Sequence, residues 1–446
     1  MMEPKISQPE GRHYEEGQYD VLVVGGGPAG STVSALLAQR GERVLLVEKD
    51  RHPRFHIGES LMPMNLPLFE ELGVKEAVER IGMAKFGVEF VSPYHDKATT
   101  LDFAQAWDKS LYYAYQVRRS EFDHILWRNA AAKGACVLEG CRITEIAFPA
   151  GGGVVASGQD SDGQARSFSA KFLVDASGRD TLLASKLAIK RRNRRHASAA
   201  VFGHFTAARR LPGKAAGNIS IFWFDHGWFW FIPLADGTTS VGAVCPPAVI
   251  KARNTDVTSF FKSLIAMSPA LSERLQDAEM TGPATATGNY SYQAERMSGK
   301  NYLLLGDAYA FIDPVFSTGV YLAMKSAFLG ADAVSACLHQ SGPLAARARR
   351  GFEADMRDAL ARFSWYIYRI NRPAMRDLFM APRNPFRVQE AMLSLLSGDV
   401  FGHSPIGPRL ALFQGLYYLK NFFLERPRLF ARRAVRPGAG AGVGDS

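Results

Sequence analysis

The feature that most constrains this chain is a glycine-rich turn between an apolar segment and a helical one. Residues 19–24, YDVLVV, are dense in apolar side chains and predict a buried parallel strand. Gly25, Gly27 and Gly30 follow in the spacing GxGxxG, and a helical pattern begins directly after them. The next segment, ERVLLVEKD, predicts a second buried strand. This βαβ unit of about 30 residues is typical of a dinucleotide-binding fold.

The residues of this turn suit a bound dinucleotide. The first glycine permits the tight turn, the second lets the backbone approach a pyrophosphate, and the third lets helix and strand pack closely. Pro28 and Ala29 complete the turn, where free N–H groups at the helix start face the phosphates. Glu48 ends the second strand and is placed to bind ribose hydroxyls, with Lys49 beside it. The glycine spacing alone also fits a plain glycine turn.

Length and composition limit the class of protein. A chain of 446 residues predicts two or three lobes, and 47% hydrophobic with 22% charged residues indicates a globular fold. The net charge of +10 is compatible with anionic partners. The four cysteines form no CxxC pair, which argues against a zinc or redox motif and favours a cytoplasmic setting. We expect neither a secretory signal nor a membrane-spanning segment.

Three further motifs indicate FAD rather than NAD. The segment LLLGDAYAFIDP, which contains Gly306 and Asp307, resembles the second FAD motif of the p-hydroxybenzoate hydroxylase superfamily. Residues 172–178, FLVDASG, resemble its DG-type motif, and Arg118 matches an arginine that lies near the FAD phosphates in that group. For Asp307 alone, a helix N-cap is an equal alternative. No second complete GxGxxG fold is visible, so a separate NADPH domain is not indicated.

Two segments resemble the signatures of the flavin-dependent halogenases. HGWFWFIPL carries the pattern WxWxIP, and FIDPVFSTG carries FxxPxxSxG. Their matching residues are Trp228, Trp230, Ile232, Pro233, Phe311, Pro314, Ser317 and Gly319. Lys85 lies in a KxGxxF context that matches the segment of the family's active-site lysine, and HIGESL, which contains Ser60, resembles the loop that borders the flavin. The resemblance runs from about residue 19 to about residue 380 and is closest to the phenol/pyrrole branch.

The resemblance implies a reaction and roles for these residues. Reduced FAD, O₂ and chloride or bromide would yield hypohalous acid. The backbone N–H groups of Thr318 and Gly319, at a helix start, would bind the halide. Lys85 would hydrogen-bond the oxidant or, as a neutral amine, form a chloramine; burial favours the second role. Trp228 and Trp230 would form a wall that keeps the flavin from oxygenating the substrate directly.

Each of these residues also has a simpler interpretation. Two tryptophans at i and i+2 are often core residues of a sheet. Lone lysines are usually solvated, and Thr318 with Gly319 could simply cap the helix that meets the flavin. Tryptophan halogenases carry a glutamate where this chain has Phe316, which argues against free tryptophan as substrate and for a phenol or a pyrrole.

The C-terminal part mixes arginines with aromatic residues. Residues 347–379 and 422–436 have this character, and KRRNRR at 190–195 is another basic cluster. An acidic acyl or peptidyl carrier protein is the favoured partner, through electrostatic steering. An ordinary solvated basic face is the alternative, and nucleic acid is not expected because no nucleic-acid motif is present.

The predicted fold is α/β, with a glutathione-reductase-type, Rossmann-like FAD domain, an antiparallel-sheet substrate domain and a helical C-terminal region. The FAD domain is assigned to 18–60, 115–190 and 298–345, the substrate domain to 61–114 and 191–297, and the helical region to 346–435. A flexible lead-in (1–17) and a disordered tail (436–446) flank them.

The predicted function is a two-component FADH₂-dependent halogenase of secondary metabolism, supplied by a separate flavin reductase and acting on an electron-rich aromatic substrate. The first alternative is a related flavin monooxygenase or dehydrogenase that does not halogenate. The second is a non-catalytic flavoprotein subunit or carrier.

Overall fold

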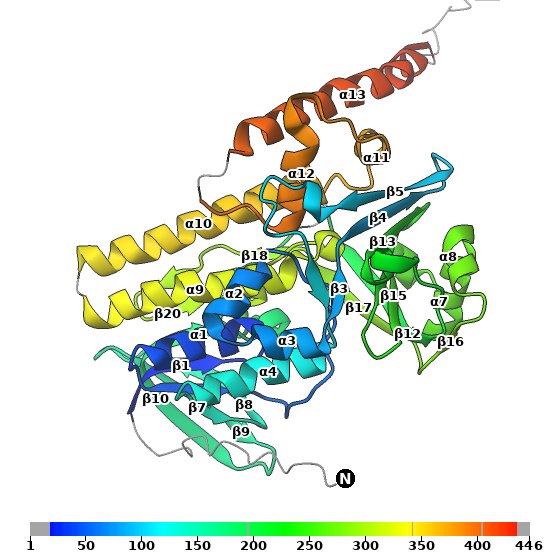
Figure 1. Cartoon of the computed structure of the whole chain (residues 1–446). Helices are drawn as coiled ribbons and strands as arrows, with labels where there is room; N and C mark the ends of the chain where they lie inside the picture. The colour runs from blue at the N-terminus through cyan, green and yellow to red at the C-terminus, as the bar shows by residue number, and fades with distance from the viewer. Residues whose placement is uncertain (1–17, 194–195, 341, 403–404, 435–446) are drawn as a thin grey trace, which may run out of the picture.

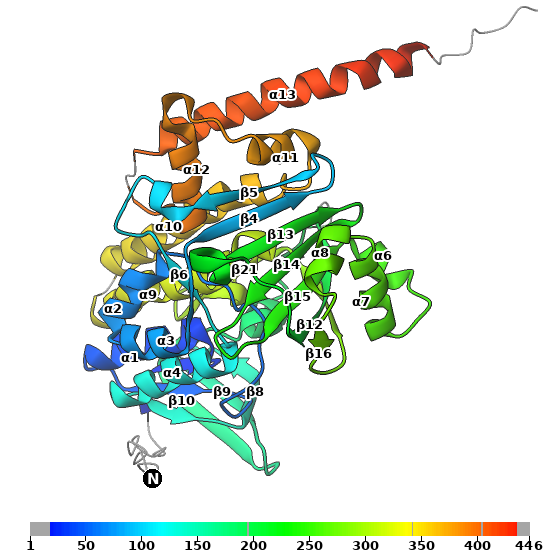
Figure 2. The ribbon, with the colours of Figure 1, turned by 45° about the vertical axis from the view of Figure 1, so that its right-hand side comes forward.

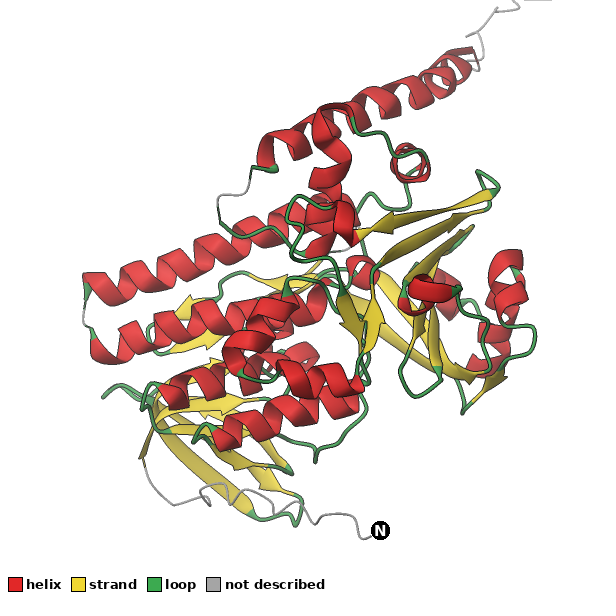
Figure 3. Ribbon diagram, in the orientation of Figure 1, coloured by secondary structure: helices red, strands yellow, loops and turns green. Residues whose placement is uncertain are grey.

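The computed structural model describes residues 18–193, 196–340, 342–402 and 405–434. The predicted lead-in (1–17), the predicted tail (436–446) and two residues of the basic KRRNRR cluster lie outside these ranges. The described chain is a mixed α/β structure with two large sheets (Figures 1 and 3). No helix within those ranges is long and apolar enough to cross a membrane.

The first sheet has a parallel centre that carries the glycine turn. β1 (Gln18–Val24) pairs in parallel with β2 (Val44–Val47) on one side and with β10 (Ala165–Asp175) on the other. β7 (Cys136–Leu138) and β20 (Tyr302–Leu304) extend it in parallel at the two edges. Residues 21–24 and 44–47 are buried throughout, as expected of strands covered on both faces. The antiparallel strands are β8 (Cys141–Ala147), β9 (Val154–Asp160) and β19 (Ser298–Gly299).

Helices pack beside this sheet and on one another. α1 (Pro28–Gln39) lies against both α4 (Arg119–Ala132) and α9 (Thr318–His339), and α10 (Pro343–Ile367) packs on α9 (Figure 1). The helix expected over 116–134 begins at Arg119, because Gln116 belongs to a strand that pairs elsewhere. The remaining short helices are α2 (Asn65–Leu72), α3 (Lys75–Ile81) and α5 (Leu182–Lys186).

The second sheet is largely antiparallel and stands beside the first (Figure 2). Its strands are β16 (Glu279–Met280), β12 (Ser198–Thr206), β15 (Thr239–Cys245), β14 (Gly227–Pro233), β13 (Ile219–Phe224), β4 (Gly87–Ser92) and β5 (Lys97–Asp102), with β17 (Thr285–Tyr290) paired to β12. The one parallel pair is β13 with β4. Three helices complete this region: α6 (Pro247–Lys251), α7 (Val257–Ala266) and α8 (Pro269–Arg274).

Two small sheets connect the layers. β3 (Met83–Lys85) pairs with β6 (Ala114–Gln116), and β11 (Lys190–Arg192) pairs with β18 (Tyr292–Ala294), which in turn pairs with β21 (Ala310–Phe311). Residues 61–114, expected to belong to the substrate region, contribute to both layers. Their helices α2 and α3 contact α1, α4 and α9, whereas β4 and β5 join the second sheet.

The C-terminal helices lie across the far side of β4 and β5. α11 (Pro373–Met380) contacts both strands, α12 (Val388–Ser397) contacts the turn at 103–105, and α13 (Gly407–Ala434) packs on α11 and α12. Figures 1 and 2 show α13 extending past the rest of the molecule. A helical C-terminal region therefore closes the top of the second sheet.

Candidate functional site

A cavity of about 650 Å³ lies between the parallel sheet and the second sheet. Its lining includes the glycine turn, the end of β2 with the loop at 54–60, residues 141–144 and 176–182, the segment at 310–320 and the strand β14. The predicted site residues that line it are Gly25, Gly27, Pro28, Ala29, Glu48, Lys49, Ser60, Asp307, Pro314, Ser317, Thr318, Gly319, Trp228, Trp230 and Ile232. Those beside it are Gly30, Lys85, Arg118, Pro233 and Gly306.

The glycine turn has room for side-chain atoms at only one of its three positions. Gly25 has φ +105°, and a Cβ there would lie 2.3 Å from the carbonyl oxygen of Ala176. A Cβ on Gly30 would lie 1.8 Å from the carbonyl oxygen of Gly25. At Gly27, by contrast, the nearest atom would be a nitrogen of Arg54 at 3.7 Å. The open second glycine is where a pyrophosphate would approach the backbone.

Glu48 is held at the floor of the cavity by two backbone groups. Its Oε2 accepts a hydrogen bond from the N–H of Gly26 at 2.6 Å, and its Oε1 accepts one from the N–H of Asp50 at 3.1 Å. Lys49 points toward Asp180, with its Nζ 2.5 Å from a carboxylate oxygen. The ribose-binding role predicted for Glu48 fits this position at the end of β2.

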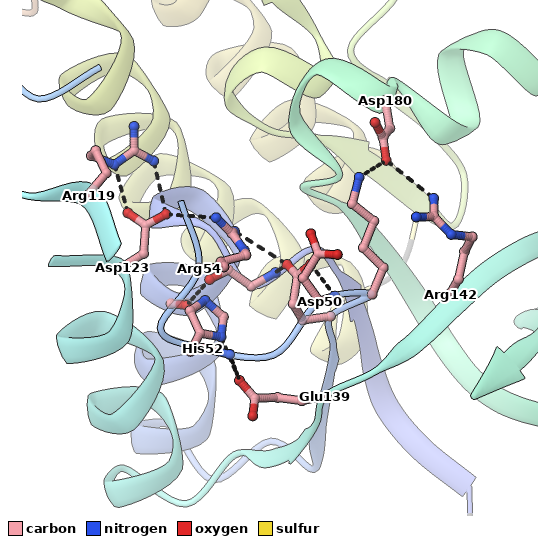
Figure 4. A network of polar contacts seen from close by, with 12 residues as sticks. Asp50, His52, Arg54, Arg119, Asp123, Glu139, Arg142 and Asp180 are labelled. Atoms are coloured by element: carbon pink, nitrogen blue, oxygen red, sulfur yellow. Dashed lines mark hydrogen bonds and ion pairs between the residues drawn. The ribbon is translucent and has the colours of Figure 1, made fainter. Parts of the chain in front are cut away.

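Two arginines that the sequence did not single out, Arg54 and Arg119, line the cavity and belong to the polar network of Figure 4. Arg119 makes a bidentate pair with Asp123, at 2.8 and 3.0 Å. Arg54 bridges Asp123 and Glu48, at 3.3 and 3.5 Å, and its Nε is buried with no hydrogen-bond partner in the described structure. Burial alone would raise the pKa of Asp123, but the Arg119 guanidinium outweighs it and the pKa is lowered. A guanidinium that lines the cavity close to Gly27 fits a bound phosphate.

Arg118 lies outside the cavity lining. Its Nε donates to Asp236 Oδ2 at 2.7 Å and its Nη2 donates to Thr238 Oγ1 at 2.6 Å, both on the loop between β14 and β15. The phosphate-binding role expected for Arg118 stays a prediction, and its neighbour Arg119 lines the cavity.

The second FAD motif brings a partly buried acid, Asp307, to the cavity. Burial raises the pKa of Asp307 to about 6. Gly306 has φ +53° and packs beside α9, where its Cβ would lie 3.1 Å from Ala323. In the DG-type motif, Asp175 accepts hydrogen bonds from the N–H groups of Ser177 and Leu183 at 2.9 and 2.7 Å. Asp175 therefore shapes the turn, while Asp307 faces the cavity.

The start of α9 offers backbone N–H groups to the cavity. Asp313 fixes the preceding turn, since Oδ1 accepts from the N–H of Val315 at 3.2 Å and Oδ2 from Ser198 Oγ at 2.9 Å. Burial raises the pKa of Asp313 to about 6. Ser317 adopts φ +59°, and Thr318 and Gly319 then open the helix. This geometry suits an anion at a helix N-terminus.

The tryptophans of β14 form one wall. Trp228, Trp230 and Ile232 line the cavity, and the two indole centroids lie 6.1 Å apart. Trp230 Nε1 donates to Ser240 Oγ at 3.1 Å, and its ring covers Gly242, where a Cβ would lie 2.2 Å from the indole. The rings belong to the core and also line the cavity, so the core interpretation is confirmed, and the wall between flavin and substrate stays a prediction.

Lys85 lies behind this cavity. Its side chain is 2% exposed, and Nζ donates to Ser60 Oγ at 2.9 Å. Ser60 itself lines the cavity. Burial lowers the pKa of Lys85 to about 7, from an ordinary value of 10.5. The alternative of a solvated surface lysine is therefore wrong, and an appreciable fraction of this amine is neutral near pH 7.

An aromatic cluster fills the space beyond the tryptophan wall. Trp223 pairs with Trp228 across β13 and β14 and stacks on Phe90 at 5.3 Å between centroids. Phe90 meets Phe379 of α11 at 4.9 Å, and Phe379 meets Phe316 at 6.3 Å. Trp223 Nε1 is buried without a hydrogen-bond partner among the described residues. Phe316 thus belongs to a buried aromatic cluster shared by four distant segments, which single-chain patterns could not reveal.

A buried acid of the loop before α2 faces the cavity opposite these rings. Glu59 Oε1 lies 2.8 Å from His204 Nε2, and Glu59 Oε2 is buried without a partner in the described ranges. Glu59 is 1% exposed and lines the cavity. Its position next to Ser60 was the only signal for it in the sequence. Metal binding is not indicated at these acids, since no group of three or more His, Cys, Asp or Glu among the described residues is arranged for it.

Comparison with known proteins places this geometry in context. The family model for tryptophan halogenase matches residues 20–106 and 95–372. Tryptophan 2-halogenase of Chondromyces crocatus is 37% identical over 325 residues, which are 71% of this chain and 61% of that protein. A 1H-pyrrole-2-carbonyl peptidyl-carrier-protein chlorinase of Pseudomonas fluorescens is 29% identical over 86% of this chain and 90% of its own length. The chain thus spans about three fifths of the first of these relatives.

Solved structures agree with the fold. The myxobacterial chondrochloren halogenase has a TM-score of 0.76 and 31% identity, covering 91% of this chain and 97% of that one. A flavoprotein/dehydrogenase from Cytophaga hutchinsonii has a TM-score of 0.83 and 26% identity, covering 92% of this chain and 100% of that one.

Proposed function

Since the chain belongs to the tryptophan halogenase family, we propose that it is an FAD-dependent halogenase of an electron-rich aromatic substrate. One observation carries the proposal furthest. A fully buried amine, Lys85, is joined through Ser60 to a cavity that has a glycine turn on one side and two tryptophans on the other. The fold resemblance implies a Rossmann-like FAD region of the glutathione-reductase type, with the domain division given above.

FAD would lie along the glycine turn. Gly27 leaves the backbone open, Glu48 is placed to accept from ribose hydroxyls, and Arg54 with Arg119 would hold the pyrophosphate. When reduced FAD is bound, it supplies the chemistry FADH₂ + O₂ + HX → FAD + HOX + H₂O. The N–H groups of Thr318 and Gly319 would hold the halide beside it.

Lys85 would then direct the oxidised halogen. As a neutral amine it takes the halogen, R–NH₂ + HOX → R–NHX + H₂O, and passes it on, ArH + R–NHX → ArX + R–NH₂. As an ammonium it instead donates a hydrogen bond to HOX. The lowered pKa favours the neutral form above about pH 7. Trp228 and Trp230 would keep the aromatic substrate away from the flavin.

The substrate class is proposed from position 316. Tryptophan halogenases carry a glutamate there, and this chain has Phe316 within a buried aromatic cluster. This difference favours a phenol or a pyrrole over free tryptophan. The similar chlorinase of Pseudomonas fluorescens is named for a carrier-bound pyrrole, and a brominase of Pseudoalteromonas luteoviolacea, 32% identical over 322 residues, bears the same substrate in its name. Carrier-bound delivery is therefore part of the proposal, as are a flavin reductase partner and a cytoplasmic location.

A second candidate is a flavin oxidoreductase that does not halogenate. The likeness to the flavoprotein/dehydrogenase of Cytophaga hutchinsonii, with a TM-score of 0.83, favours it. The two candidates separate in one assay. The protein is supplied with a flavin reductase, NADH, O₂, bromide and a panel of phenols, pyrroles and pyrrole thioesters.

A halogen isotope pattern in the product supports the first candidate. Flavin turnover without halogenated product across the whole panel contradicts it. Direct consumption of NADPH without a reductase, with an oxygenated product, supports the second.

A further inference from the structure

One segment connects Lys85 to the outer surface. Phe103 places its ring 5.5 Å from Lys85 Nζ and is buried, whereas Trp107, four residues later, is partly exposed. The N–H of Trp107 donates to Ser394 Oγ of α12 at 2.8 Å. The segment 103–107 therefore runs from the reactive lysine to the edge of the C-terminal helices.

Two guanidinium groups stand over the indole of Trp107. The Cζ of Arg387 lies 3.7 Å from the ring centre and that of Arg409 lies 4.4 Å from it. Arg387 ends the 3₁₀ turn Pro385–Arg387, and Arg409 belongs to the first turn of α13. Cation–π contact stabilises each one, but two cations on one ring also repel each other.

The charges of this site are only partly balanced. Arg387 pairs with Glu390, with Nη2 2.6 Å from Oε2. Arg409 donates from Nη1 to the carbonyl oxygen of Pro405 at 2.7 Å, and its Nε is buried with no hydrogen-bond partner in the described part of the chain. An oxyanion beside the outer nitrogens of Arg387 and Arg409 would relieve the repulsion between the two cations.

An exposed aromatic residue flanks the cations. Phe386 is 80% exposed, the largest exposure among the large hydrophobic side chains described. Phe386 and Arg387 both adopt positive φ, at 53° and 63°, which is costly for residues other than glycine. The exposed ring of Phe386 next to Arg387 offers a partner an apolar contact beside the cations.

We propose that Trp107, Phe386, Arg387 and Arg409 form the docking site for a carrier protein. In this arrangement the arginines bind the phosphate of its phosphopantetheine arm, and the arm follows segment 103–107 toward Lys85. A phosphodiester on an acidic, helical protein matches two guanidiniums with an adjacent apolar contact. The inference rests on the proposed function, because it assigns a surface to the carrier-bound form of that substrate.

The test compares one acyl group on two carriers. Arg387→Gln, Arg409→Gln and the double variant are assayed with pyrrole-2-carboxyl thioesters of a holo carrier protein and of N-acetylcysteamine. We expect the double variant to raise KM for the carrier-bound thioester about tenfold, with kcat within about twofold. The small thioester should be halogenated as by the wild type. Arg357→Gln is the matched control, since Arg357 is also an exposed arginine paired with a glutamate on its own helix.

Each other outcome has a definite meaning. Equal losses with both thioesters, or no change with either, overturn the docking site. A wild type that halogenates only the small thioester overturns it too, while the proposed halogenation stands. If the wild type halogenates neither thioester but halogenates a free phenol or pyrrole of the panel, the docking site is overturned and the proposed halogenation stands. If it halogenates no member of the panel, the proposed function fails, and binding of the holo carrier protein to wild type and variants then decides the surface on its own. Competition by free coenzyme A without any preference for the carrier protein also contradicts the proposal.

Discussion

The glycine turn and Lys85 stand on two sides of the same cavity and depend on the chain in different ways. At Gly25 and Gly30 the fit is between backbone atoms, and any Cβ would overlap a carbonyl oxygen. At Lys85 the backbone is ordinary strand, and burial changes the chemistry of the side chain. Adding a side-chain atom at Gly25 or Gly30 should therefore disrupt the turn. At Lys85, in contrast, replacing the amine should matter more than changing the shape of the side chain.

The largest effect is expected for Lys85→Met. The substitution keeps an unbranched side chain in the buried position and removes the amine, so halogenation should fall about a thousandfold, at the scale of losing a catalytic group. FAD content and flavin oxidation should stay as in the wild type. Mass spectrometry of the product measures halogenation, and absorbance of the bound flavin measures FAD content and flavin oxidation. Lys75→Met, at the exposed start of α3, is the control. Retained halogenation would remove Lys85 from the mechanism.

On the other side of the cavity, Gly30→Ala should weaken FAD binding. Its Cβ would lie 1.8 Å from the carbonyl oxygen of Gly25, so helix and strand must separate. We expect the free energy of FAD binding to weaken by about 3 kcal/mol, which raises Kd roughly a hundredfold. Quenching of flavin fluorescence measures this Kd. Gly151→Ala, where a Cβ meets nothing within 4 Å, is the control. Equal affinity in both variants would contradict the close-packing argument.

The pH dependence of stability distinguishes the two sides further. The pKa of Lys85 is about 7 in the folded protein against 10.5 ordinarily, so between these values the unfolded chain binds one more proton. Stability of the wild type should then rise from pH 7 toward pH 10.5, and below pH 7 this contribution is constant. Relative to Lys85→Met, the wild type should gain roughly 2–4 kcal/mol over that window. Urea denaturation at pH 7 and pH 10 measures it, and a constant difference would show that the amine is solvated.

The smallest effect is expected at the tryptophan wall, where the Trp230 side chain packs directly on the backbone of Gly242. In Gly242→Ala the new Cβ would lie 2.2 Å from the Trp230 indole, which must move. We expect a loss of about 1–3 kcal/mol in the free energy of unfolding. More reduced flavin should also be consumed per halogenated product. Thermal unfolding and the ratio of NADH used to product formed measure the two effects. If Trp230 is displaced and the ratio of NADH used to product formed does not change, the wall does not separate flavin from substrate.

The sequence predicted one side of the cavity better than the other. Gly25, Gly27, Gly30 and Glu48 lie in one βαβ unit, where local spacing determines the geometry. Lys85 was identified only through its family context, since the segments that bury it come from elsewhere in the chain.

Other features of the site had no local signal at all. Arg54 and Arg119 both pair with Asp123. Trp107 contacts Arg387 and Arg409, which lie about 300 residues further along the chain. Such contacts follow from the packing of distant elements, which the pattern of a single chain does not encode.

The backbone pairing of Ser60 couples the lining of the cavity to Lys85. Ser60 forms a β-bridge with Gln116 of β6, the strand that also pairs with β3 and so with Lys85. The loop that lines the cavity and the lysine behind it are thus neighbours in one small hydrogen-bonded unit. Any cofactor state that shifts Ser60 must change the proton affinity of the amine, and by reciprocity the protonation of Lys85 must change the affinity for that state. Cofactor binding and protonation of Lys85 are then thermodynamically coupled.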